Sequence, residues 1–278
     1  MRPICLVVPC YNEAARFDAE GMAALAKLLN QPGDPSSPPG AARRGEDVTL
    51  LFVNDGSTDE TPSQLRSFCD RADVEAELLS YDRNRGKAEA VRCGMRHALA
   101  AGAGIVGYAD ADLATSPEDV QRLLSVLERG GYSVVLGSRV QLLGYSIERS
   151  AFRHYVGRVY GTLASMILGI RIYDTQCGAK FFRHSAALDR ALAEPYVSRW
   201  CFDVELLGRL LIGAPGAPAV LLDEVRELPL KRWRDVPGSK LSLRDAHRVA
   251  WELTRVALDL ARRRRLVRQE APDSVRRS

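Results

Sequence analysis

The sequence lacks the features that mark several large classes of protein. No window holds eighteen uninterrupted apolar residues and the N-terminus carries no signal-peptide pattern, so we expect a chain that neither spans a membrane nor carries an export signal. The six cysteines form no CxxC pair, which argues against a zinc site or a disulfide framework and favours reduced, buried thiols in a cytosolic protein. The net charge of +4 is mild, and we expect no nucleic acid partner.

What is present is an alternation of strand-like and helix-like segments. A hydrophobic content of 46% over 278 residues is enough to bury a sizeable core. Short apolar runs alternate with segments of helical periodicity, which predicts an α/β fold. The expected strands are residues 4–8, 48–53, 77–81, 132–136 and 220–230, and the expected helices include residues 13–29, 117–129 and 150–169.

We expect one domain over residues 1–240, a C-terminal helix over residues 241–266 and a disordered tail over residues 267–278. Residues 31–46 are rich in Pro, Gly and Ser and have no periodicity, so we interpret them as a flexible insert without chemistry. Ser242 is expected to cap the last helix, with Asp245 at the reciprocal position. The apolar residues of this helix share one face: Ala246, Val249, Leu253, Val256 and Leu260.

The stretch from Ile105 to Leu113 carries the clearest chemical signal. An apolar run of strand length ends in Asp110 and Asp112, and on a strand the i, i+2 spacing places both carboxylates on one face. At the end of a strand in an α/β sheet, two carboxylates suit a Mg²⁺ or Mn²⁺ ion shared with substrate phosphates. The alternative is a turn whose aspartates cap the helix that begins at 116–118.

Charged residues also follow two neighbouring strands. Asp55 ends the second strand, and Arg85 and Lys87 stand at the start of a helix, where backbone N–H groups already favour anions. Two solvated surface charges explain Arg85 and Lys87 equally well. Two motifs are decoys. Gly86-Lys87 lacks the rest of a Walker A loop, and the GxGxxG pattern at 102–107 follows a helix instead of a strand.

Seven motifs in order give the sequence a family resemblance. VVPCYNE, VNDGSTD, NRGKAEAV, YADADL, GSR, DTQCGAKFF and RWCFDVELL together resemble family 2 glycosyltransferases of GT-A fold, and most of all the dolichyl-phosphate β-glucosyltransferase type. The resemblance runs from about Ile4 to Lys240. The sequence differs from that family in its Pro-rich insert, and we expect neither the N-terminal membrane anchor nor the C-terminal membrane helices of some members.

The resemblance implies a Rossmann-like, mostly parallel sheet flanked by helices, and it assigns roles in binding a UDP-sugar. Pro9, Tyr11 and Glu13 would line the base and ribose, with Tyr11 as a stacking surface. Asp55 would accept a hydrogen bond from the uracil N–H, and Arg85 or Lys87 would lie near the diphosphate. The Asp110-Ala111-Asp112 segment would bind the ribose and the Mg²⁺ or Mn²⁺ ion, with Asp112 as the main metal ligand.

The same resemblance suggests how an acceptor binds. Arg139 and Arg153 would hold a lipid phosphate, because guanidinium geometry suits phosphate, and Gln176 and Lys240 would lie at the same site. Asp203 falls where members with hydroxyl acceptors place their general base. A phosphate acceptor is already ionised and needs no base, so Asp203 would then only orient the sugar or the acceptor.

Three functions are compatible with these residues. The first is an inverting glucosyltransferase that moves glucose from UDP-glucose to a polyprenyl phosphate, as a peripheral protein on the cytosolic face of the membrane. The second is a soluble transferase with a hydroxyl acceptor and Asp203 as base. The third is a non-catalytic protein that binds nucleotide sugars, and the intact Asp55, Asp110 and Asp112 count against it.

Two helices are candidates for membrane contact. The C-terminal helix carries its apolar face and then Arg262 to Arg265, so it can lie in the headgroup layer with its arginines on anionic lipid. The 150–169 helix offers a second amphipathic surface beside Arg139 and Arg153. The alternative is that both apolar faces pack on the protein core and that the arginines form a solvated tail.

Overall fold

The computed structural model describes residues 3–31, 48–148, 151–234 and 246–270. Nearly all of the predicted insert, together with Lys240, Ser242 and Asp245, lies outside these residues. The strands are β1 (Ile4–Cys10), β2 (Val48–Asp55), β3 (Ala76–Tyr81), β4 (Ile105–Tyr108), β5 (Val134–Ser138), β6 (Ser146–Glu148), β7 (Lys180–Arg183), β8 (Val225–Pro229) and β9 (Arg232–Arg234). The helices are α1 (Ala19–Asn30), α2 (Thr61–Arg71), α3 (Lys87–Ala100), α4 (Pro117–Arg129), α5 (Ala151–Leu168), α6 (Ala186–Ala193), α7 (Phe202–Ile212) and α8 (Ala246–Glu270), with a short 3₁₀ turn at Leu222–Glu224.

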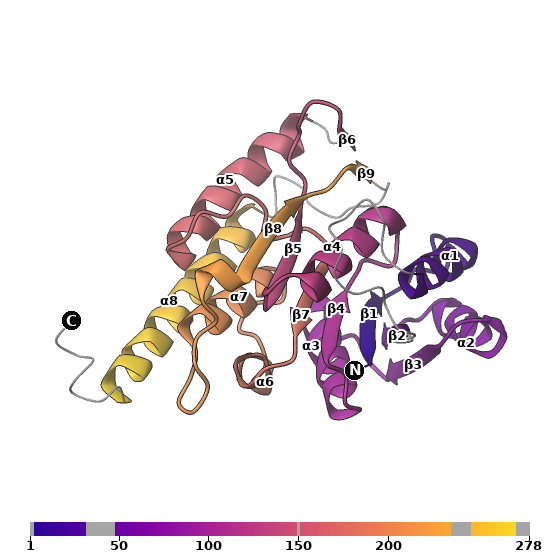
Figure 1. Ribbon diagram of the computed structural model, residues 1–278, viewed down its shortest axis with the longest axis horizontal. Helices are drawn as coiled ribbons and strands as arrows, with labels where there is room; N and C mark the ends of the chain where they lie inside the picture. The colour runs from indigo at the N-terminus through magenta and orange to yellow at the C-terminus, as the bar shows by residue number, and fades with distance from the viewer. Residues whose placement is uncertain (1–2, 32–47, 149–150, 235–245, 271–278) are drawn as a thin grey trace.

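The described strands form a seven-stranded sheet in the order β3-β2-β1-β4-β7-β5-β8, and β6 pairs separately with β9 (Figure 1). Within the large sheet only β7 is antiparallel to its neighbours, so the sheet is mostly parallel, as expected. The chain leaves β1 toward β2 on one side and reaches β4 on the other, which makes the gap between β1 and β4 a topological switch point. Open α/β sheets bind ligands at such points, beyond the carboxyl ends of the strands.

Helices cover both faces of the sheet, which explains why its strands are continuous apolar runs. Leu6 and Val8 of β1 face the layer made by α1, α2 and α4. Val7 of the same strand faces the opposite core, which α3, α5, α6, α7 and α8 share. The period-2 alternation of a strand thus divides its side chains between two cores.

The first helix begins later than predicted. The sequence favours a start near Glu13, but α1 begins at Ala19, with Asp18 as its N-cap accepting from Gly21 N at 2.9 Å. Residues before Asp18 form a turn in which Arg16 N and Phe17 N both donate to the Glu13 carbonyl. A residue with a strong capping side chain thus sets the start, and Glu13 is left at the sheet edge instead of inside a helix. The helix after β2 begins at Thr61, whose N–H donates to the Asp59 carboxylate at 3.0 Å.

The C-terminal part differs from the prediction in three places. The strand expected at 220–230 is shortened to β8, because a 3₁₀ turn occupies the residues before it. The sequence did not predict α6 or the β6–β9 pair. Helix α8 continues to Glu270, beyond the predicted end at residue 266. The apolar face of α8 packs on the protein core: Leu253, Val256 and Leu260 are buried, and a side chain on Gly208 of α7 would overlap Leu260. The prediction that this face lies in lipid is therefore wrong, because α7 already covers it.

No helix in the described residues is long and apolar enough to cross a membrane. All six cysteines are free, and four of them are buried: Cys5, Cys10, Cys177 and Cys201.

Candidate active site

The two aspartates of the predicted metal site lie just beyond a strand. Strand β4 ends at Tyr108, so Asp110 and Asp112 belong to the following loop, and the same-face argument for a strand does not apply to them. A tight turn brings them together instead: Leu113 adopts a left-handed backbone conformation (φ 50°), and the Asp112 carboxylate accepts from Ala114 N at 3.0 Å. Neither aspartate caps α4, because Ser116 does so by accepting from Asp119 N.

Asp110 has two neighbours from distant segments of the chain, one before it and one after it. The Lys87 ammonium at the start of α3 forms an ion pair and a hydrogen bond with Asp110 Oδ1. On its other side lies Gly178, where an added Cβ would overlap the Asp110 carboxylate. The glycine of the DTQCGAKFF motif is therefore needed to leave room for the aspartate of the YADADL motif.

Negative charge accumulates at this edge of the sheet. Burial raises the pKa of Asp112, and the nearby Asp110 raises it further. Burial also raises the pKa of Glu13, to which the charges of Asp112 and Asp110 add. A divalent cation would relieve this repulsion, so the carboxylates suit the Mg²⁺ or Mn²⁺ expected here. No group of three or more His, Cys, Asp or Glu side chains in the described residues could hold a metal.

Asp55 organises the loop that precedes Lys87. Its two carboxylate oxygens accept from Arg85 N at 2.8 Å and from Gly86 N at 2.7 Å, and the residue is 2% exposed. Gly86 has φ 96°, a conformation that a side chain would strain. The proposed bond from Asp55 to uracil stays a prediction, and the carboxylate also fixes the loop that carries both cations.

The other predicted nucleotide-binding residues lie at the same edge. Pro9 pairs in register with Val53 near the end of β1, and Tyr11 follows that strand in a half-buried position. Arg85 lies over the ring of Tyr81 at 4.5 Å, and Ala111 is buried between the two aspartates. Strand β1 and the segments that follow β1, β3 and β4 therefore carry these residues at the same edge of the sheet as Asp110, and their roles in binding a nucleotide stay predictions.

On the acceptor side, Arg139 follows β5 and forms a bidentate ion pair with Asp174. Its Nε donates to Asp174 Oδ2 at 2.6 Å and its Nη2 to Asp174 Oδ1 at 2.9 Å, while the guanidinium lies 5.3 Å from the ring centre of Trp233. Burial alone would raise the pKa of Asp174, but the Arg139 charge and its hydrogen bonds hold that pKa at about 2. A phosphate bound to Arg139 would have to share it with Asp174.

The remaining acceptor residues are placed less fully. Gln176 N donates to Asp174 and its side-chain amide donates to the Trp200 carbonyl at 3.4 Å, so Gln176 lies beside the Arg139 pair. Arg153 is in the first turn of α5, and its side chain lies outside the described part of the structure, as does Lys240.

Asp203, in the first turn of α7, has buried partners. Its Oδ1 accepts from Lys180 Nζ at 2.7 Å and from the Tyr108 hydroxyl. Burial raises the pKa of Tyr108 well above its usual value, and the Asp203 charge adds to this. Sequence reasoning missed both partners of Asp203. A lysine next to two phenylalanines in GAKFF was the available signal, because a lysine inside a buried strand needs a carboxylate.

Nearby carboxylates raise the pKa of both predicted phosphate-binding cations. The Lys87 side chain is 43% exposed; its partial burial lowers its pKa, but Asp110 and Asp203 outweigh this and raise it. Burial also lowers the pKa of Arg139, and Asp174 raises it above the usual value.

Comparison with known proteins shows similarity over most of the chain. The sequence profile of glycosyl transferase family 2 matches residues 5–189. The chain is 30% identical over 258 residues to dolichyl-phosphate beta-glucosyltransferase of Saccharomyces cerevisiae and 31% identical over 250 residues to that of Drosophila melanogaster, and each match covers 86% of this chain and 69% of the relative. Among solved structures, glucosyl-3-phosphoglycerate synthase from Mycobacterium tuberculosis, in complex with Mn²⁺, UDP and glucosyl-3-phosphoglycerate, has a TM-score of 0.60 at 18% identity. That match covers 93% of this chain and 80% of the synthase.

Proposed function

The chain belongs to glycosyl transferase family 2 and has the GT-A fold, and from this premise we propose that it transfers glucose from UDP-glucose to a polyprenyl phosphate. The relatives named as dolichyl-phosphate β-glucosyltransferases support the sugar and the acceptor class. The observation that carries the proposal is the Lys87–Asp110 ion pair beyond the carboxyl end of β4, with the Arg139–Asp174 ion pair beyond β5 of the same sheet.

The proposed reaction exchanges one bond at the anomeric carbon. An oxygen of the acceptor phosphate attacks C1 of glucose from the face opposite to the nucleotide, the bond from C1 to the diphosphate breaks, and UDP leaves with the electron pair. Inversion follows from attack on the opposite face. Lys87 and Arg85 stand at the helix start where the departing diphosphate would gather charge, and preorganised cations stabilise such charge. A Mg²⁺ or Mn²⁺ ion held by Asp110 and Asp112 would supply further neutralisation.

The contacts of Asp203 fit a positioning role. One oxygen of Asp203 accepts from Lys180 and Tyr108, which fixes the carboxylate in place. A phosphate needs no base, so Asp203 would then position the sugar or the acceptor. A hydroxyl acceptor with Asp203 as base is the second candidate, which the intact carboxylate supports.

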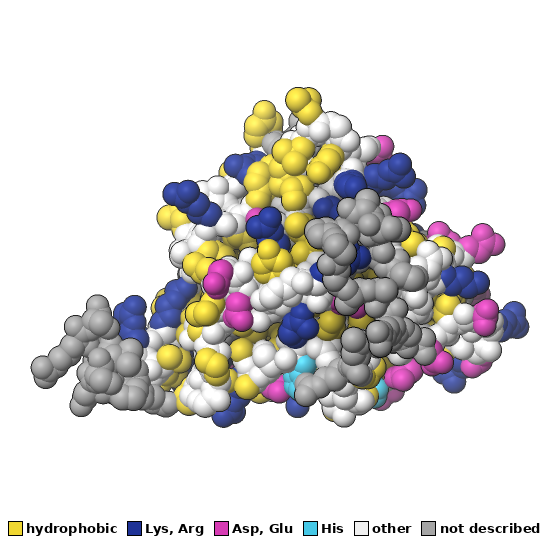
Figure 2. Space-filling model, in the orientation of Figure 1, with side chains coloured by type: hydrophobic (Ala, Val, Ile, Leu, Met, Phe, Trp, Pro, Cys, Tyr) yellow, Lys and Arg dark blue, Asp and Glu magenta, His cyan; other side chains and the backbone are white. Residues whose placement is uncertain are grey.

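We place the lipid at the outer face of α5. This helix contains no acidic residue, and its exposed side chains are largely apolar: Tyr155, Val156, Val159, Leu163 and Met166. The loop before β6 adds exposed Leu142, Leu143 and Tyr145. Figure 2 shows hydrophobic side chains gathered at the top of the molecule, where Figure 1 places α5 and that loop. Arg158 and Arg171, both exposed, border this surface and suit anionic headgroups, so we propose peripheral attachment at the cytosolic face.

A transfer assay tests the proposal. Purified protein is incubated with UDP-glucose, Mg²⁺ or Mn²⁺, and a short polyprenyl phosphate, with the matching polyprenol as the control acceptor. We expect glucosyl phosphate only from the phosphorylated acceptor and only without EDTA. Asp112→Asn should remove this divalent-dependent turnover while circular dichroism stays unchanged. Full activity in EDTA would reject the role of the metal. Tighter binding of GDP than of UDP, measured by calorimetry, would reject the uridine donor. Transfer to the polyprenol alone would reject the phosphate acceptor.

A further inference from the structure

Four backbone amides of the loop that leads into α7, residues 196–201, donate to side chains. Val197 N and Ser198 N donate to the Glu205 carboxylate at 3.0–3.2 Å. Trp200 N donates to Glu252 Oε2 at 2.9 Å, and Cys201 N donates to Ser198 Oγ at 2.7 Å. Charged acceptors make strong hydrogen bonds to N–H groups, so two glutamates determine the course of this short loop.

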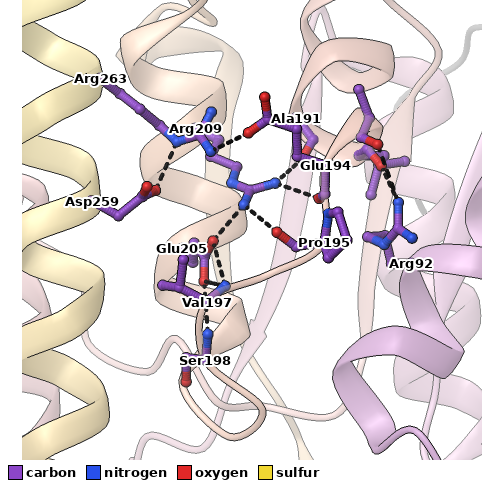
Figure 3. A network of polar contacts seen from close by, with 12 residues as sticks. Arg92, Ala191, Glu194, Pro195, Val197, Ser198, Glu205, Arg209, Asp259 and Arg263 are labelled. Atoms are coloured by element: carbon purple, nitrogen blue, oxygen red, sulfur yellow. Dashed lines mark hydrogen bonds and ion pairs between the residues drawn. The ribbon is translucent and has the colours of Figure 1, made fainter.

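The two glutamates are supported differently. Glu205 belongs to α7 itself, and Arg209 one turn later pairs with it and also donates to the carbonyls of Ala191, Glu194 and Pro195, as Figure 3 shows. That network joins α6 to α7 and is local in sequence. Glu252 comes from α8, about fifty residues after the loop, and it alone connects the loop to the C-terminal helix through a carboxylate.

Glu252 also controls the start of α7. Its Oε2 accepts from the Ser198 hydroxyl at 2.6 Å, and the oxygen of that hydroxyl in turn accepts from Cys201 N. Cys201 is the N-cap residue of α7 and supplies no capping side chain of its own. Ser198, oriented by Glu252, therefore fixes the backbone of the residue at which α7 begins. Asp203 is two residues beyond Cys201.

The loop reaches both halves of the site. Arg199 donates to Asn84 Oδ1 at 3.0 Å and lies beside Gly86, in the segment that Asp55 holds in front of Lys87. The Trp200 carbonyl accepts from Gln176, and the Trp200 ring packs edge-on against Tyr160 of α5 with ring centres 5.4 Å apart. A shift of this loop would therefore move side chains on the donor side and on the acceptor side together.

We propose that Glu252 is a positioning residue of the transferase site. Helix α8 would then help to fix the geometry of that site. Glu252 is 7% exposed, so its loss would leave the Ser198 hydroxyl and the Trp200 N–H without their acceptor in a nearly closed space. The loop would relax, and Asp203 and Arg199 would lose their fixed positions. Small displacements of this kind reduce turnover strongly, because catalysis requires the reacting groups to be held at the correct distance and orientation. This inference rests on the proposed function.

The test compares Glu252→Ala, Glu252→Gln and, as the control, Arg248→Ala. Arg248 contacts only the outer oxygen of Glu252, at 3.4 Å, and its side chain is 63% exposed. Three quantities are measured: UDP affinity and binding stoichiometry by calorimetry, the rate of UDP-glucose hydrolysis, and the rate of transfer to a polyprenyl phosphate. Amide hydrogen exchange at Trp200 and Cys201 reports on the loop directly.

We expect Glu252→Ala to lower kcat of hydrolysis and of transfer at least tenfold. UDP should still bind with a stoichiometry near one and an affinity within about twofold of wild type. The Trp200 and Cys201 amides should exchange hydrogen faster. Glu252→Gln keeps an acceptor oxygen and should recover most of the rate, and Arg248→Ala should behave as wild type. Unchanged kcat in Glu252→Ala, or a loss that only follows the folded fraction counted by UDP binding, overturns the inference. A wild-type protein that hydrolyses UDP-glucose but never transfers it refutes the proposed acceptor, while the hydrolysis rates still decide the role of Glu252.

Discussion

At the scale of single residues, Gly178 decides where a metal-binding carboxylate can lie. A Cβ at this position would overlap Asp110, so Gly178→Ala should displace that carboxylate or the DTQCGAKFF turn. We expect turnover to fall at least tenfold and the Mn²⁺ concentration needed for half-maximal rate to rise, with the circular dichroism spectrum retained. The matched control is Gly131→Ala, because a Cβ there meets nothing within 4 Å. Equal Mn²⁺ titrations for both variants would show that Gly178 is not required for this purpose.

A second residue-scale prediction concerns the Arg139–Asp174 pair and its pH dependence. The folded pKa of Asp174, about 2, lies below its ordinary value of 3.8, so the pair stabilises the fold above about pH 4 and loses this effect as pH falls toward 2. The shift corresponds to about 2 kcal/mol, of which roughly half is lost by pH 3.

Arg139→Met removes the cation and leaves Asp174 buried. Removing one partner of a buried pair costs about 3–5 kcal/mol. We expect this cost, measured by urea unfolding, to be at least about 1 kcal/mol smaller at pH 3 than at pH 5, because the lone carboxyl can take up a proton. A cost that does not change with pH would mean that Asp174 is not ionised through its contact with Arg139.

At the scale of elements, α8 is part of the core and not a detachable membrane helix. Leu260 is fully buried against Gly208, so Leu260→Ala should destabilise the protein by about 2–5 kcal/mol. Leu258 is 67% exposed on the same helix, and Leu258→Ala should change stability by no more than about 0.5 kcal/mol. Chemical denaturation of the two variants measures this difference. Similar small effects for both would mean that α8 packs only loosely on α7.

The elements also show what sequence patterns can predict. The edge that carries Asp55, Lys87 and Asp110 could be predicted because each lies at or after the carboxyl end of a parallel strand, and parallel strands deliver those ends to one edge without tertiary information. The sequence left the apolar stripe of α8 open between lipid and the protein core, because a helix face for α7 and a helix face for lipid have the same 3.6-residue period. The buried Lys180–Asp203 pair was missed because its members are distant in sequence, and only the folded sheet brings them into contact.

At the scale of the whole molecule, the exposed apolar side chains of α5 determine where a membrane can be bound. Val159 and Met166 are 62% and 73% exposed, so replacing both with Gln should leave the fold intact. Burying one such side chain contributes about 1.5–3 kcal/mol, so the double variant should bind vesicles at least tenfold more weakly. Leu222→Gln, at an exposed position before β8, is the matched control.

The arginines near the C-terminus make a separate, salt-dependent contribution to the same binding. Arg263 pairs with Asp259 and Glu194, and Arg264 donates to the carbonyls of Ile167 and Leu168 at the end of α5, so both act inside the protein. Arg262 and Arg265 are exposed, and replacing only these two with Gln should weaken binding to anionic vesicles by about 1 kcal/mol each at low salt and much less at high salt.

Sedimentation with vesicles of mixed neutral and anionic lipid distinguishes the two contributions, since the Val159→Gln, Met166→Gln variant should lose binding at every salt concentration. Turnover on a short, soluble polyprenyl phosphate should stay near the wild-type value in all these variants, because within the described residues none of the substituted side chains bonds to Asp110, Arg139 or Asp203. If wild-type protein does not bind anionic vesicles at low salt and glycosylates a soluble alcohol, the proposal of a lipid phosphate acceptor is contradicted. The hydroxyl acceptor, with Asp203 as base, would then be the better account of this fold.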